Sequence, residues 1–192
     1  MRKSIIAILM TFCLSIMTYA QTPRDRATEL KEQAQSSLNQ KDYIKARYLF
    51  KKAYEAFATR ENYPQAIECG VQANALYVRE NFYKEGFELC RDMDQLIWAG
   101  EQNQKKVFYD LRFLVNKERL QMYTALKNPA QAKTQLNKLE ETANLAKNDS
   151  LTEVLLYTKA NYYYTFNQNT QGDACFRKLI NQYKEKKDYA KV

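Results

Sequence analysis

The chain has 192 residues, of which 45% are hydrophobic and 27% charged, enough for one domain with a buried core. Four Gly and three Pro leave few turn formers for the many short connections of a sandwich or barrel, so we expect an all-helical fold. The formal net charge is +8, and the absence of histidine excludes mechanisms that need an imidazole base or ligand.

Residues 1–20 have the three parts of a secretory signal peptide. Two basic residues follow Met1, an apolar stretch covers 5–17, and Ala20 is the small residue expected before a cleavage site. We therefore expect export to the periplasm and a mature chain that begins at Gln21. The alternative is a retained membrane anchor, for which this apolar stretch is short.

After this segment, apolar residues recur at spacings of three and four, as they do on one face of a helix. All three prolines follow a capping residue and suit the first turn of a helix. Asp42 is expected to cap one helix, and Ser150 with Glu153 has the spacing of a capping box. These signals predict helices at 23–39, 43–59, 63–80, 83–98, 104–126, 129–146, 151–166 and 170–185, joined by short polar turns.

Alternate helices open with one repeated pattern. It consists of a starting residue, a small residue three positions later and a large residue four positions after that, as in Tyr43-x-x-Ala46-x-x-x-Phe50. The small residue returns as Gly86, Ala132 and Gly172, at steps of 40, 46 and 40 residues. A small residue in the first turn lets a neighbouring helix approach closely, so the pattern predicts stacked helix pairs.

The pattern resembles the tetratricopeptide repeat (TPR), whose second helix opens with Tyr-x-x-Ala and carries an aromatic residue four positions later. Asp42-Tyr43 stands where the family has its Gly-Asp-Tyr turn, and Leu156, Ala160 and Tyr163 match positions of its first helix. The resemblance covers residues 25 to 185. It implies an all-α, TPR-like solenoid of about four antiparallel helix pairs, forming a right-handed superhelix without a sheet, over 21–187. HEAT-like helix pairs and a closed helical bundle remain as alternatives.

The resemblance also implies a concave groove lined by the first helix of each pair. Amide, basic and aromatic side chains at the groove positions suit an extended peptide with acidic or carboxylate groups. The positions implied are Lys31, Gln35, Asn39, Val71, Arg79, Lys117, Gln121, Thr124, Tyr157, Asn161 and Tyr164.

The sequence carries no motif for catalysis, phosphate binding or metal binding. Its carboxylate pairs, Glu140-Glu141 and Asp92 with Asp94, point in different directions on a helix. We therefore expect no enzyme activity, no cofactor and no metal. Basic and acidic residues alternate without a block of like charge, so nucleic acid is not an expected partner.

Three cysteines would remain after signal cleavage: Cys69, Cys90 and Cys175. Their number is odd, none has the spacing of a metal ligand, and each lies in an apolar helical stretch. We expect three buried free thiols. A Cys69–Cys90 disulfide is the alternative, because an exported protein meets an oxidising compartment.

The export signal and the TPR-like body together resemble the N-terminal periplasmic region of membrane-anchored signalling regulators of Gram-negative bacteria. The resemblance implies a sensory module that binds a protein or peptide and precedes a transmembrane helix with a kinase or DNA-binding domain. The alternative is a free periplasmic or secreted scaffold protein. A downstream apolar segment of about 20 residues would distinguish the two.

Residues 187–192 repeat the character of 41–46, where a helix begins. We therefore expect 188–192 to be the start of a truncated further helix. An uncapped end of a solenoid exposes the surface meant for the next repeat, so self-association through this end is expected. Extension by one helix pair should raise the melting temperature.

Overall fold

A computed structural model describes residues 25–185, and within this range the chain forms helices without any strand. The signal peptide and the truncated C-terminal helix expected from the sequence lie outside the described residues. The helices are α2 (Arg26–Asn39), α3 (Tyr43–Thr59), α4 (Tyr63–Arg79), α5 (Tyr83–Gln104), α6 (Tyr109–Ala125), α7 (Pro129–Ala146), α8 (Asp149–Thr165) and α9 (Asn169–Glu185).

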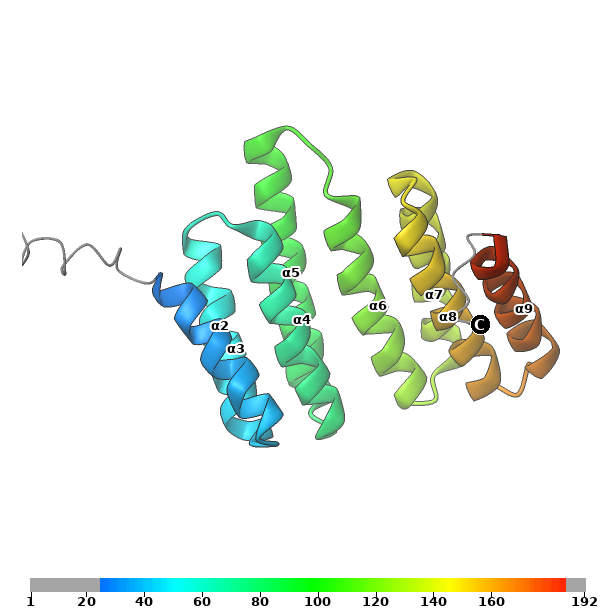
Figure 1. Ribbon diagram of the computed structural model, residues 1–192, viewed down its shortest axis with the longest axis horizontal. Coiled ribbons are helices and arrows are strands. Elements are labelled where there is room, and N and C mark those ends of the chain that lie inside the picture. The colour runs from blue at the N-terminus through cyan, green and yellow to red at the C-terminus, as the bar shows by residue number, and fades with distance from the viewer. Residues whose placement is uncertain (1–24, 186–192) are drawn as a thin grey trace, which may run out of the picture.

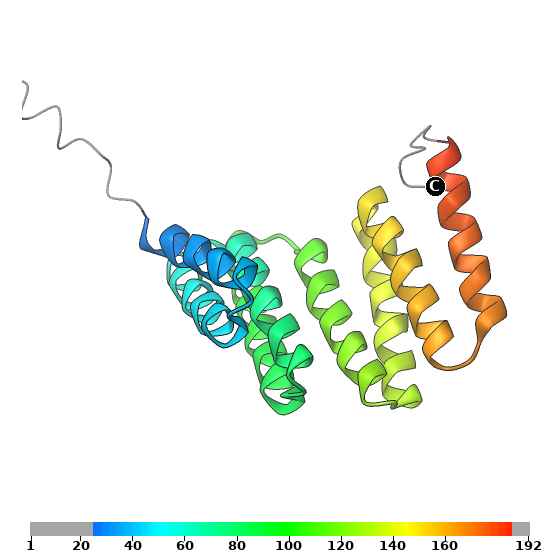
Figure 2. The ribbon, with the colours of Figure 1, turned by 60° about the horizontal axis from the view of Figure 1, so that its bottom comes forward.

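The helices stack in an open row. Each packs on the next along the chain, and α6 also packs on α4 and α8. Figure 1 shows the row running from α2 at one end to α9 at the other, with α2, α4, α6 and α8 nearer the viewer than α3, α5 and α7. The turned view in Figure 2 keeps the two ends far apart. The expected all-α solenoid of helix pairs is confirmed, and the helices between residues 25 and 185 do not close into a bundle.

Five turns between helices share one backbone geometry. After the helix ends, one residue adopts a left-handed backbone, and the next donates its N–H to a carbonyl five residues earlier, as in a Schellman motif. At the first turn, Lys41 has φ 63° and the N–H of Asp42 lies 2.9 Å from the oxygen of Ser37. None of the left-handed residues is glycine: they are Lys41, Glu61, Asn81, Lys127 and Asn167.

Most predicted helix starts are confirmed. Asp42, Asn62 and Asn128 each follow a left-handed residue, and each side chain accepts a backbone hydrogen bond from the residue three positions later. One residue therefore closes a helix and caps the next, which keeps the turns short. Prolines in the first turn of α4 and α7 fit because a helix leaves those N–H groups unpaired.

Three predicted starts are wrong, those of α2, α6 and α8. α2 begins at Arg26 and not at 23, because Asp25 is its N-cap and accepts the N–H of Ala27 at 3.1 Å. α8 begins before the expected capping box, because a left-handed Lys147 ends α7 and leaves Asn148 to cap the next helix. Ser150 is therefore a donor to that cap, at 2.9 Å, and not the cap itself.

The boundary between α5 and α6 departs most from the sequence prediction. α5 continues past the predicted end at 98 to Gln104, and α6 begins at Tyr109 instead of 104. In Figure 1 the end of α5 rises above the neighbouring helices before the chain turns into α6. Gly100 permits this turn, since a Cβ there would lie 2.8 Å from the ring of Phe108.

The core forms two clusters that share α6. The first joins α2–α5 to Val115 and Met122 of α6, and the second joins α7 and α8 to Phe113 and Leu120 of α6. Successive residues of a helix turn by about 100°, so these two pairs lie on opposite sides of α6. The small repeat residues Ala46, Gly86, Ala132 and Gly172 are all buried, as the pattern predicts.

The three cysteines of the described chain are free and buried, so the prediction of free thiols is confirmed and no Cys69–Cys90 bridge forms. Burial raises the pKa of Cys69 to about 11 and that of Cys90 to about 12. Their thiols are therefore uncharged at neutral pH and poor nucleophiles.

Candidate functional site

At the N-terminal half of the array, the predicted groove residues are engaged in contacts within the chain. Lys31 of α2 donates to Gln65 at 2.8 Å and pairs with Glu68 at 2.7 Å, which ties α2 to α4. The guanidinium of Arg79 lies 3.9 Å from the centre of the Tyr43 ring. Gln35 and Asn39 lie on the surface, where the side-chain amide of Gln35 donates to Asn39 at 3.2 Å. Val71 packs against the first core cluster.

At the C-terminal half, five predicted residues come together in one groove between α6 and α8, with a volume of about 360 Å³. Tyr157 presents a ring that is 54% exposed. The hydroxyl oxygen of Thr124 is buried there without a hydrogen-bond partner in the described part of the chain. The five residues, called the α6–α8 groove set below, are Lys117, Gln121, Thr124, Tyr157 and Asn161.

The charge of the α6–α8 groove is positive. Among the described residues that line it, the ionised side chains are Lys117 and Lys127, and no carboxylate is present. Lys117 also donates to the buried Glu118 at 3.1 Å. Glu118 in turn accepts the amide of Asn74, in α4, at 3.1 Å, so a buried polar link anchors this part of α6. Sequence reasoning missed the link, whose one signal is an acidic residue within an apolar stripe.

Tyr164, the remaining predicted position, is fixed against α9. Its hydroxyl donates to Asp173, which raises the pKa of Tyr164, and its ring stacks on Phe176 with the ring centres 5.9 Å apart. Gly172 makes room for the ring, since a Cβ there would lie 2.9 Å from it. Tyr164 therefore joins α8 to α9 and does not line the α6–α8 groove.

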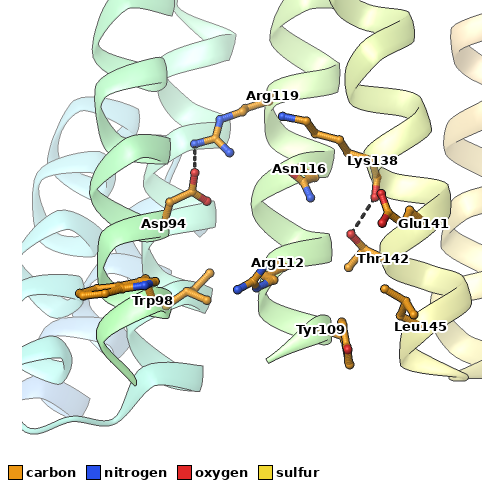
Figure 3. Close-up of a pocket in the computed structure, with 11 residues that line it drawn as sticks. Asp94, Trp98, Tyr109, Arg112, Asn116, Arg119, Lys138, Glu141, Thr142 and Leu145 are labelled. Carbon is orange, nitrogen blue, oxygen red and sulfur yellow. Dashed lines mark hydrogen bonds and ion pairs between the residues drawn. The ribbon is translucent and has the colours of Figure 1, made fainter. Parts of the chain in front are cut away.

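A second recess, the α5–α7 cleft, was not predicted. It has a volume of about 420 Å³, walls formed by α5 and α7, and a floor formed by α6. Figure 3 shows an aromatic and aliphatic end with Trp98, Tyr109 and Leu145, and a charged end with Arg119 and Lys138. The residues that line the cleft are Asp94, Ile97, Trp98, Tyr109, Arg112, Asn116, Arg119, Lys138, Glu141, Thr142 and Leu145.

Two ion pairs join α6 to α5 along this cleft. Arg119 lies 2.5 Å from a carboxylate oxygen of Asp94 and also donates to the carbonyl of Cys90 at 3.0 Å. Arg112 donates to both carboxylate oxygens of Glu101. Burial would raise the pKa of Glu101, but the hydrogen bonds from Arg112 and Phe108 outweigh it and leave that pKa below its ordinary value.

Across residues 25–185, no cluster of three or more cysteine, aspartate or glutamate side chains could hold a metal ion. No helix in the same range is sufficiently long and apolar to cross a bilayer. No protein-family model, curated protein or solved structure matches this chain. The arrangement of side chains is therefore the basis for the proposals below.

Proposed function

We propose that this chain is a non-enzymatic TPR module that binds a protein or peptide segment in the α6–α8 groove. The observation that carries the proposal is the convergence of the α6–α8 groove set from two helices that are not adjacent in sequence. Helical solenoids use such surfaces between repeats to bind extended ligands. The buried small residues at the start of the second helices, such as Ala46, support the assignment to TPR units.

The chemistry of the groove favours an acidic, extended segment. Lys117 and Lys127 supply positive charge, while Gln121 and Asn161 supply amide donors and acceptors. The ring of Tyr157 offers a flat apolar surface beside them. Lys117 is already paired with the buried Glu118, so Lys127 is the lining cation that a bound carboxylate would meet without an acidic partner within residues 25–185, which favours acidic peptides over basic ones.

The test uses an acetylated hexapeptide of alternating Glu and Ala, with a Lys and Ala hexapeptide of equal length as control. Isothermal titration at low salt should detect the acidic peptide and not the basic one. The double substitution Gln121→Ala and Asn161→Ala should weaken binding by about tenfold, which corresponds to about 1.4 kcal/mol. Lys133→Ala, at an exposed position of α7 outside the groove, is the matched control. Equal binding of both peptides would contradict the proposal.

We also propose that the module works in the periplasm as the sensory part of a larger signalling regulator. The signal-like start of the chain and the TPR-like body support this assignment, with a free periplasmic scaffold as the alternative. N-terminal sequencing of exported protein should give Gln21 as the first residue. An apolar segment encoded soon after residue 192 would favour the regulator, and a stop codon would favour the scaffold.

A further inference from the structure

We infer that the α5–α7 cleft is a second interaction surface, which binds an amphipathic helix of a partner protein. It lies on a different face of α6 from the α6–α8 groove. The groove uses Lys117 and Gln121, whereas the cleft uses Arg112, Asn116 and Arg119, which are turned away from them by about 100° or more around the helix axis. A ligand in one recess therefore leaves the other accessible.

The aromatic end of the cleft provides an apolar anchor. Trp98 of α5 is 63% exposed and Leu145 of α7 is 51% exposed, and they stand on opposite walls with Tyr109 between them (Figure 3). A single large apolar side chain inserted here would contact both walls. Trp and Tyr side chains contribute much of the binding energy of many protein interfaces, and here Trp98 is exposed while Tyr109 is half-buried.

The charged end of the cleft favours an acidic side chain on the partner helix. Arg119 is already paired with Asp94, and Arg112 with Glu101, both on the α5 side. Lys138 reaches from α7 toward Arg119 and makes no ion pair within residues 25–185 (Figure 3).

The remaining carboxylate of the cleft, Glu141, lies about one turn along α7 and does not pair with Lys138. A partner carboxylate placed between Lys138 and Arg119 would therefore be attracted by two cations, of which one has no acidic partner.

The spacing and the walls favour a helix over an extended segment. Lys138 and Leu145 are seven residues apart on α7, about 10 Å along its axis. A partner helix lying beside α7 would match them with an acidic residue and a large apolar residue also seven positions apart. All three sides of the cleft are helices whose backbone groups are already hydrogen-bonded within each helix. An extended peptide therefore could not form backbone hydrogen bonds with the cleft, whereas a helical peptide satisfies its backbone groups internally.

Trp98 is the one tryptophan of the chain, so its fluorescence reports on this cleft alone. The probe is an alanine-based helical peptide without tryptophan, with Glu and Phe seven positions apart on one face. Titration should shift the Trp98 emission to shorter wavelength and saturate. The same peptide with Lys in place of Glu should bind at least about tenfold more weakly.

A charge reversal makes the test specific. Lys138→Glu should invert the preference, so that the Lys peptide binds more tightly than the Glu peptide. Lys133→Glu, which makes the same charge change on another face of α7, should leave the preference unchanged, and circular dichroism checks that both variants fold. Gln121→Ala should also leave it unchanged, because that residue belongs to the α6–α8 groove.

Three outcomes would overturn the inference: no emission shift up to about 1 mM peptide, an unchanged preference in Lys138→Glu, or a shift caused by rising protein concentration alone. The last would indicate a second copy of this chain as the occupant. Failure of the acidic hexapeptide to bind in the α6–α8 groove would leave the Trp98 result standing, so the two proposals fail separately.

Discussion

The carboxylate of Glu101 lies 2.8 Å from the backbone nitrogen of Phe108 and accepts its hydrogen bond across the turn between α5 and α6. The side chain that receives this bond is only 5% exposed. Phe108 directly precedes α6 and offers no side-chain cap of its own. An acidic residue in the last turn of one helix therefore fixes the first turn of the next.

Replacing Glu101 by Gln should destabilise the protein by about 1–3 kcal/mol, because it removes the charge that Arg112 and the N–H of Phe108 bond in a buried place. Urea unfolding at neutral pH measures the change. Glu55→Gln is the control, since the Lys52–Glu55 pair is exposed and should contribute less than about 1 kcal/mol. Equal losses in the two variants would contradict the role given to Glu101.

The stability that Glu101 provides should depend on pH. Its pKa in the folded chain lies below the ordinary 4.5, so above pH 4.5 the carboxylate is charged in both states and its contribution is complete. As the pH falls below 4.5, the unfolded chain binds the proton first and stability decreases. The stability difference between wild type and Glu101→Gln should therefore shrink between pH 6 and pH 3. A difference constant over that interval would refute the assignment.

Lys41→Gly should stabilise the protein by about 0.5–1 kcal/mol. The exposed Lys41 has φ 63°, where a Cβ is strained and glycine is not. Lys51→Gly, in the middle of α3, should instead destabilise by about 1 kcal/mol, because glycine is unfavourable inside a helix. Thermal unfolding of both variants checks the opposite signs.

Ala46→Leu should destabilise by about 1–3 kcal/mol, the usual cost of overpacking. Ala46 is 0% exposed and stands where two helices approach closely in the first repeat. Ala174→Leu, at an exposed position of α9, supplies the same change without a packed neighbour and should be nearly neutral. Equal melting temperatures for the two variants would count against the pairing of helices at Ala46.

A thiol reagent should find three reactive cysteines in the mature chain after denaturation without reductant. In the native protein at pH 8, Cys69 and Cys90 should react slowly, because both are buried and their pKa values lie near 11 and 12. Cys175, at 8% exposure, should react first. Finding a single thiol after denaturation would mean that a disulfide forms.

Local signals predicted most of the helices because each turn is built from adjacent residues. The capping side chain of Asp42 and the prolines of α4 and α7 act within one helical turn, so the sequence alone locates them. Ser150 misled the prediction because Asn148 competes for the same role and follows a left-handed residue. The end of α5 could not be predicted, because Glu101 acts on Phe108 across a turn that only the folded chain defines.

The two recesses also show that the sequence predicts local patterns but not contacts between distant helices. The α6–α8 groove set follows from the repeat pattern, since its members occupy equivalent faces of α6 and α8. Lys31 and Tyr164 fit the same pattern but find partners in neighbouring helices, which the pattern does not encode. The α5–α7 cleft arises from three helices at once, and no single stretch of sequence predicts it.

The exposed face of α9 is polar, which bears on the expected self-association through the C-terminal end of the array. Its exposed positions include Asp173, Arg177, Lys178 and Lys184, so this helix already presents a charged surface to solvent. Association through the end of the chain stays a prediction, and the described surface of α9 does not favour it.

The position of α6 between two clusters determines how the protein should come apart. In a linear array each unit is stabilised by its neighbours, so unfolding starts at the ends and proceeds inward. Val115 and Met122 bind α6 to one cluster while Phe113 and Leu120 bind it to the other. We therefore expect the amides of α6 to exchange with deuterium only after both halves have opened, and α6 to be the slowest-exchanging of the described helices. Unfolding of the two halves should be coupled through this helix.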